Sequence, residues 1–205
     1  MKTDTRTLAR TIVNPTEGYS VTFLVSGSET DYAYTYVEAV LPPGAGTPVH
    51  YHLDFTEEFE AVEGELGIQL GKKHILLHPG EPSAIVPLKV VHKFYNPGSS
   101  PVRFRAIIRP ARRFEQLLRT TYGLAADGLC NKKGLPKSLL TLALVYEMGE
   151  SYLPGLPLWF QKSVFGLLAR IARYKKRDIE LRKYYVGMIE ASDQEMHKRK
   201  LSTSL

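Results

Sequence analysis

Apolar and polar residues alternate in short runs between Tyr19 and Arg109, and this pattern predicts β-strands. Strand side chains point alternately to two faces, so a period of two indicates strands with one buried face. Gly, Pro, Asp or Ser separates the runs, and no helical pattern lies between them. Short strands that follow one another in this way predict an antiparallel sandwich or barrel. The nine runs are VTFLVSG, YAYTYVEAV, PVHYHL, EFEAVEG, LGIQL, KHILLH, SAIVP, VHKFYN and VRFRAIIR.

The pattern changes to helical spacing at Pro110. In ARRFEQLLRTTYGL the apolar residues recur every three or four positions, and Gly123 is expected to end the helix. KSLLTLALVYEM is apolar on almost every face, so we expect this helix to be buried on more than one side. RDIELRKYYVGMIEAS is a further expected helix, followed by a polar tail. The sequence therefore predicts a mainly β protein with a C-terminal helical extension.

Pro157 opens another expected helix, LWFQKSVFGLLARIARYKK. Its basic residues cluster near the C-terminal end, where they complement the helix dipole. Tertiary core or a dimer interface is the simpler explanation for its apolar stripe, and contact with a membrane surface is the alternative. The expected stripe consists of Leu158, Trp159, Phe165, Leu168 and Ile171.

Length and composition favour one globular domain with an appendage. The chain has 205 residues, of which 43% are hydrophobic and 23% charged. Cys130 is the single cysteine, so no intrachain disulfide can form, which fits a reducing compartment. The start has no apolar run of signal-peptide length, and no stretch has the length and apolarity of a membrane span. We therefore expect a cytoplasmic protein.

The net charge of +6 comes entirely from residues 157–205, where eleven Lys and Arg residues accompany five Asp and Glu residues. A basic segment suits an acidic partner or an anionic surface, but a solvated helix face is the simpler explanation. The segment has no recognisable nucleic-acid-binding motif, which argues against DNA or RNA as a partner.

Four residues form a candidate metal site: His50, His52, Glu57 and His92. Two histidines at positions i and i+2 of a strand point to the same face. A carboxylate from the next strand and an imidazole from an opposing strand could close around one ion. Three imidazole nitrogens and one carboxylate oxygen suit Fe, Mn, Ni or Zn, and the donor set does not select among them.

Turn residues frame these four in two spaced motifs. GAGTPVHYHLDFTEEFEAVEG runs from Gly44 to Gly64, and GEPSAIVPLKVVHKFYN runs from Gly80 to Asn96. The first resembles in full the first motif of the cupin superfamily, Gly-x5-His-x-His-x(3,4)-Glu-x6-Gly. The second resembles the family's Gly-x5-Pro-x-Gly-x2-His-x3-Asn, with one extra residue before Pro87 and Lys89 where the family has Gly. We expect Lys89 to loosen a tight turn without moving a ligand.

The resemblance covers residues 12–112, about half the chain. It implies an antiparallel jelly-roll β-barrel over this range, preceded by a polar arm at 1–11 and followed by the helical extension at 113–205. It also implies metal binding at the four residues, although a cupin that keeps them but works without metal stays open. The family includes dioxygenases, isomerases, decarboxylases and binding proteins.

Other residues are weaker candidates. His74 and His78 are more simply exposed than ligands, and Glu58 is expected to point away from Glu57. Phe59, Phe94 and Phe104 are expected in the core. One face of YAYTYVEAV could line the barrel: either Tyr34, Tyr36 and Glu38, or Thr35, Val37 and Ala39.

Three functions remain open. The first is a metal-dependent enzyme, dioxygenase-like or an isomerase, that acts on a small organic substrate. The second is a non-catalytic module that binds or senses a small molecule, and the third is an interaction role for the helical half. Exposed sheet edges and the apolar bulk of the helices also predict a homodimer.

Overall fold

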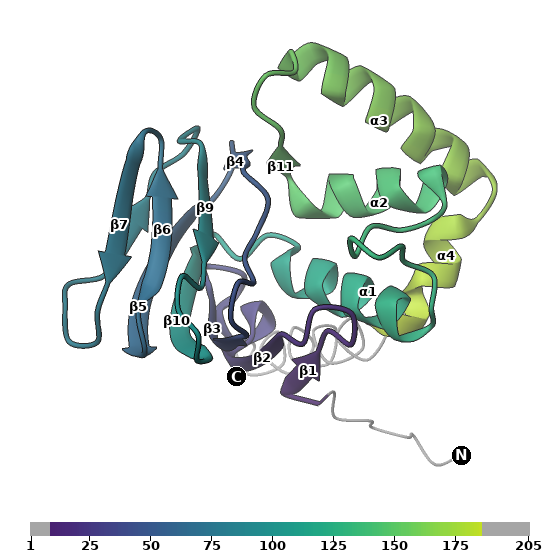
Figure 1. The fold of residues 1–205 in the computed structure, drawn as a ribbon. Coiled ribbons are helices and arrows are strands. Elements are labelled where there is room, and N and C mark those ends of the chain that lie inside the picture. The colour runs from purple at the N-terminus through teal and green to yellow at the C-terminus, as the bar shows by residue number, and fades with distance from the viewer. Residues whose placement is uncertain (1–8, 186–205) are drawn as a thin grey trace, which may run out of the picture.

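The computed structural model describes residues 9–185, in which β-sheets and helices occupy separate regions (Figure 1). A six-stranded sheet has the order β1-β2-β3-β10-β5-β8, and a three-stranded sheet has the order β7-β6-β9. Every strand pairing is antiparallel. The strands are β1 (Thr11–Val13), β2 (Ser20–Val25), β3 (Thr35–Leu41), β4 (Tyr51–His52), β5 (Thr56–Glu63), β6 (Leu66–Leu70), β7 (Lys73–Leu77), β8 (Ala84–Val86), β9 (His92–Tyr95), β10 (Val102–Arg109) and β11 (Ser151–Tyr152).

Each of the nine predicted runs overlaps one of these strands, which confirms the mainly β prediction. A short 3-10 helix, η1 (Gly27–Thr30), and the strands β1 and β11 were not expected. Isolated bridges Gly46–Tyr95 and His50–His92 pair β9 with the segment that precedes β4. The described strands do not form one closed hydrogen-bonded ring, so the jelly-roll barrel stays a prediction.

The main core lies on the inner face of the six-stranded sheet. Val37 and Ala39 of β3 point into it, while Tyr36 and Glu38 lie on the opposite face, where Arg105 donates to Glu38 over 3.1 Å. This decides which face of YAYTYVEAV is internal. Phe59 and Phe104 are buried and Phe94 packs against them, as expected.

The helices α1 (Phe114–Ala126), α2 (Leu139–Gly149), α3 (Leu158–Tyr174) and α4 (Arg177–Leu181) follow, with a final 3-10 helix η2 (Arg182–Tyr184). As expected, α2 is packed on several sides, by α1, α3 and α4. The expected stop at Gly123 is wrong, because α1 continues to Ala126. Gly123 serves packing instead: a Cβ there would lie 2.2 Å from the ring of Tyr184.

The expected stripe on α3 is also partly wrong. Phe165 and Leu168 are half-buried, but Trp159 and Ile171 are exposed. The fully buried positions are Gln161, Ala169 and Ala172. Small residues allow helices to approach closely, so α3 packs through its alanines and turns larger apolar side chains outward.

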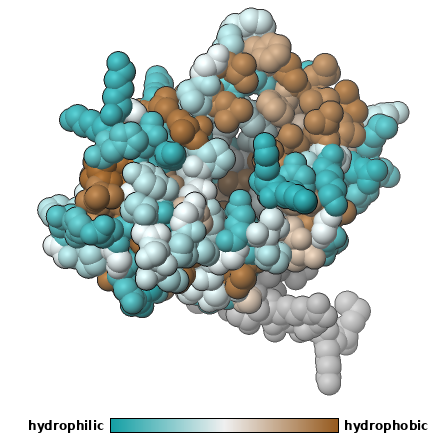
Figure 2. Space-filling view, viewed as in Figure 1, coloured by the Kyte–Doolittle hydropathy of each residue, from teal (hydrophilic) through white to brown (hydrophobic). Residues whose placement is uncertain are grey.

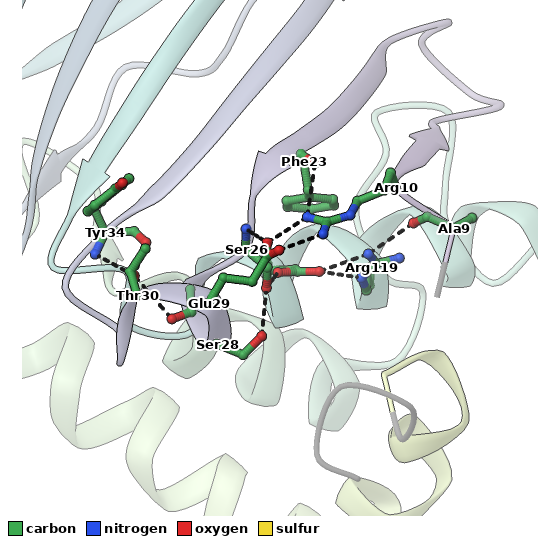
Figure 3. A network of polar contacts seen from close by, with 11 residues as sticks. Ala9, Arg10, Phe23, Ser26, Ser28, Glu29, Thr30, Tyr34 and Arg119 are labelled. Atoms are coloured by element: carbon green, nitrogen blue, oxygen red, sulfur yellow. Dashed lines mark hydrogen bonds and ion pairs between the residues drawn. The ribbon is translucent and has the colours of Figure 1, made fainter. Parts of the chain in front are cut away.

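A polar network joins the helical half to the first strands (Figure 3). Arg10 pairs with Glu29 at 2.6 Å, and Ser26 donates to the buried carboxylate of Glu115. Arg119 donates to that carboxylate and to the carbonyl of Ala9. Because these contacts cross between the two halves, their division at 12–112 and 113–205 into separate domains stays a prediction.

Among the described helices, none has both the length and the apolar character needed to cross a bilayer. Residues 1–8 of the expected arm, and the part of the last expected helix beyond Tyr185, lie outside the described residues.

Candidate metal centre

The four predicted ligands converge from three segments of the sheets. His52 lies on β4, Glu57 on β5 and His92 on β9. His50 pairs directly with His92: each backbone N–H donates to the other residue's carbonyl, at 2.9 and 2.8 Å. The three imidazole ring centres lie 4.3 to 5.2 Å apart. The bridge and the strands therefore set the position of each ring.

The Nδ1 atom of every histidine in this group lies within hydrogen-bonding distance of a backbone carbonyl. His50 Nδ1 lies 2.7 Å from the carbonyl of Pro48, and His92 Nδ1 lies 2.9 Å from that of Val90. His52 Nδ1 lies 3.3 Å from the carbonyl of Glu150, in the helical half. A carbonyl only accepts hydrogen bonds, so Nδ1 carries the proton in each case, and Nε2 is the atom that faces the group. Nε2 of His92 lies 2.8 Å from a carboxylate oxygen of Glu57, so an ion would have to displace the proton they share.

The donor atoms of this group are close enough to share one ion. One ligand atom from each residue can be chosen so that all four lie within 4.8 Å of one another. His52 Nε2 is buried and has no hydrogen-bond partner. A buried polar atom without a partner costs free energy, and a bound cation would remove that cost. The donor set and this unpartnered nitrogen fit a divalent metal; ligation itself stays a proposal.

Burial and the Glu57 carboxylate determine the protonation states of the four side chains. Burial lowers the pKa of His52 to about 4, and Glu57 offsets only part of that effect. Burial also lowers the pKa of His50. Burial opposes the charged form of His92, but its 2.8 Å hydrogen bond to Glu57 and the charge of that carboxylate outweigh burial and raise the pKa of His92. Burial favours neutral Glu57, yet the hydrogen bond with His92 and the nearby imidazoles lower the pKa of Glu57.

A largely apolar cavity of about 390 Å³ adjoins the group. His50, His52 and Glu57 line its wall, and His92 is fully buried behind them. The inner face of the six-stranded sheet forms one side, and the helical half forms another. The helical half contributes Phe114, Leu117, Leu118, Thr121, Tyr122, Lys133, Gly134, Leu135, Gly149, Ser151 and Leu153.

Sequence reasoning missed what the helical half adds to this site. Strand β11 pairs with β4, opposing Ser151 to His52, and the preceding Glu150 presents its carbonyl to His52 Nδ1. Glu150 is held at a left-handed helix end, φ 45°, and forms an ion pair with Arg112. Nothing local in the sequence marks this pairing, because it joins residues about a hundred positions apart.

The other candidates lie away from the group. His74 is exposed on β7, and Nδ1 of His78 lies 3.4 Å from a carboxylate oxygen of Glu65. Glu58 faces the opposite side of β5 from Glu57 and accepts a hydrogen bond from Ser83. The expectation that Lys89 loosens its turn stays a prediction. Lys89 takes the left-handed conformation, φ 65°, and its N–H donates to the carbonyl of His52 over 2.7 Å, which ties this turn to β4.

Residues 37–108, which include all four candidate ligands, match the sequence model of a family described as Cupin domain. This part of the chain is a cupin domain, which confirms the resemblance carried by the two motifs.

Three similar proteins show how far the likeness extends. "Oxidoreductase iacF" of Pestalotiopsis fici is 29% identical over 140 residues, which are 62% of this chain and 68% of that protein. "Oxidoreductase OpS7" of Beauveria bassiana is 32% identical over 78 residues, 35% of this chain but only 26% of that protein. The structure of a predicted oxalate decarboxylase from Thermotoga maritima is 19% identical, covering 54% of this chain and 99% of that one, with a TM-score of 0.44.

Proposed function

We propose that this protein is a metal-dependent cupin oxidoreductase, dioxygenase-like, that acts on a small organic substrate. The observation that carries the proposal is the buried group of three histidines and one glutamate in the wall of an apolar cavity. The two similar proteins named as oxidoreductases support the general class.

In this proposal His50, His52 and His92 bind one divalent ion through Nε2, and Glu57 binds it through a carboxylate oxygen. The ion is Fe, Mn, Ni or Zn; bound iron would supply dioxygen activation, and zinc would supply Lewis acidity. The carbonyls of Pro48, Val90 and Glu150 orient the three rings. We also propose that the cupin segment is a jelly-roll barrel.

The cavity then determines what the substrate resembles. Phe55, Phe59 and Phe104 make its wall apolar, so they exclude water and favour an apolar substrate body. His50, His52 and Glu57 are the polar groups in one part of that wall, so a polar atom of the substrate is expected to face them. Tyr19 also lines the cavity, but its hydroxyl already donates a hydrogen bond to the Gly46 carbonyl over 2.6 Å.

The alternative function is a non-catalytic module that binds or senses a small molecule. The cavity favours this reading because both halves of the chain line it, so a ligand would contact sheet and helices together. A binder would gain thermal stability with its ligand but would consume neither ligand nor dioxygen.

Metal analysis tests the site first. Protein purified without chelator or nickel resin should contain about one divalent ion per chain, and the double variant His50→Ala/His92→Ala should contain almost none. The matched control, His74→Ala/His78→Ala, should keep the wild-type content. Equal metal in both double variants would rule out the assigned ligands.

Dioxygen consumption separates the two functions. The metal-loaded protein should consume dioxygen with a library of small apolar substrates in an oxygen-electrode assay. A metal-loaded protein that is stabilised by a ligand without any turnover would instead support the binding module.

The proposed assembly is a homodimer, and the proposed location is the cytoplasm. Light scattering at micromolar concentration should give twice the chain mass of 23.1 kDa. A mass near 23.1 kDa would show a monomer, in which the helices cover their own sheet without a partner.

A further inference from the structure

Helix α3 presents a stripe of large apolar side chains to solvent. At 3.6 residues per turn, Phe160, Val164, Leu167, Ile171 and Tyr174 fall within an arc of about 80°. All five are exposed, with Leu167 at 60% and Tyr174 at 89%. This arc is distinct from the buried face of α3 that packs on α2. We call these five residues the α3 stripe; Figure 2 shows hydrophobic residues gathered over this helix, at the upper right.

Exposed apolar residues extend the α3 stripe along the preceding loop. Leu153 and Leu156 are each more than two-fifths exposed, and Trp159 is 70% exposed at the start of the helix. Leu153 also lines the cavity beside the candidate metal site. The exposed apolar surface therefore runs from the cavity to the outermost helix of the fold (Figure 1).

The charges around the α3 stripe are positive. Lys162, Arg170 and Arg173 lie on the remaining side of the helix, Lys175 caps its end, and α3 contains no acidic residue. Arg173 is partly neutralised by Glu147. In an antiparallel pairing of two α3 helices, the basic flanks of the two copies would face each other, and like charges oppose such contacts. The apolar stripe would match a partner with an apolar interior, and the basic residues beside the stripe would match negative charges at the edge of that interior.

We propose that α3 and the loop before it dock on the surface of an anionic lipid bilayer. Phe, Trp and Leu would enter the boundary between headgroups and acyl chains, while Lys and Arg would remain at the anionic headgroups. Docking would place the part of the cavity wall at Leu153 beside the bilayer, where apolar small molecules concentrate.

Vesicle co-sedimentation of the full chain tests this directly. Wild-type protein should sediment with vesicles of phosphatidylcholine and phosphatidylglycerol, and less with phosphatidylcholine alone. Leu167→Glu should weaken binding by about tenfold or more, since it replaces an inserted apolar side chain with an anion. Leu76→Glu is the matched control, because Leu76 is 48% exposed on β7, away from α3; it should bind as the wild type does.

The basic residues have a separate signature. Arg170→Gln/Lys175→Gln should reduce the preference for anionic vesicles while leaving the weaker binding to phosphatidylcholine unchanged. Circular dichroism melts of each variant check that it is folded. The proposal is overturned if folded wild-type protein does not sediment, or if Leu167→Glu binds as well as Leu76→Glu. It is also overturned if the wild type is a dimer that Leu167→Glu converts to a monomer, since a second copy would then cover the α3 stripe.

Discussion

Buried His52 should make the metal-free protein lose stability in mild acid. Its side chain is 5% exposed and its Nε2 has no hydrogen-bond partner, so protonation in the folded state is costly. Burial lowers the pKa of His52 from 6.5 to about 4. Between these two values the unfolded chain binds a proton that the folded chain excludes. The stabilisation from neutral His52 is therefore complete above pH 6.5 and is lost as the pH falls toward 4.

The expected loss is about 2 kcal/mol between pH 6.5 and pH 4.5, from the linkage between proton binding and unfolding. His50 contributes with the same sign, because burial lowers the pKa of His50 too. The pKa of His92 is raised, so its contribution is complete below pH 6.5 and is lost only at higher pH. The pKa of Glu57 is lowered, so its contribution is lost only below pH 4.5. Among the four candidate ligands, only His50 and His52 therefore lower the stability in this window.

Urea unfolding in the presence of chelator, at intervals from pH 6.5 to pH 4.5, measures the effect. His52→Asn removes the titrating ring, while the new amide can still donate to the carbonyl of Glu150. This variant should lose about 2 kcal/mol less than the wild type across the window. His74→Asn, on an exposed position, should follow the wild type. If His52→Asn loses as much stability as the wild type, burial of His52 does not have the assigned effect.

Three further predictions concern the site and its supports. Metal binding at neutral pH should release about one proton per ion in a pH-stat titration, because an ion must displace the proton that His92 Nε2 shares with Glu57; His92→Asn should release less. Lys89→Gly should raise the free energy of unfolding by about 1 kcal/mol in urea, because it relieves a left-handed backbone, and a loss of stability would contradict this. Glu115→Ala should lower it by about 3 kcal/mol because Arg119 stays buried without its partner, whereas Glu115→Leu/Arg119→Met should recover most of that loss.

Local pattern was sufficient for the strands and for the candidate ligands. Alternation with a period of two located all nine expected strands, because strand formation on a half-buried sheet depends on neighbours two positions apart. The same alternation placed His50 and His52 on one face, and spacing separated Glu57 from Glu58. His92 was expected on an opposing strand, and the structure brings the four residues together. Ion binding stays a prediction.

Only tertiary structure decided the features that depend on contacts between distant residues. Which face of β3 is internal depends on the sheet that packs against it. Gly123 lies inside α1, where the Tyr184 ring leaves no room for a Cβ, and the His52 tautomer depends on a carbonyl that β11 brings to β4. The apolar residues of α3 form one pattern in sequence, but Ala169 and Ala172 take the buried face because close helix packing selects small side chains. Periodicity shows that a helix has an apolar side; it does not show which residues the rest of the fold will cover.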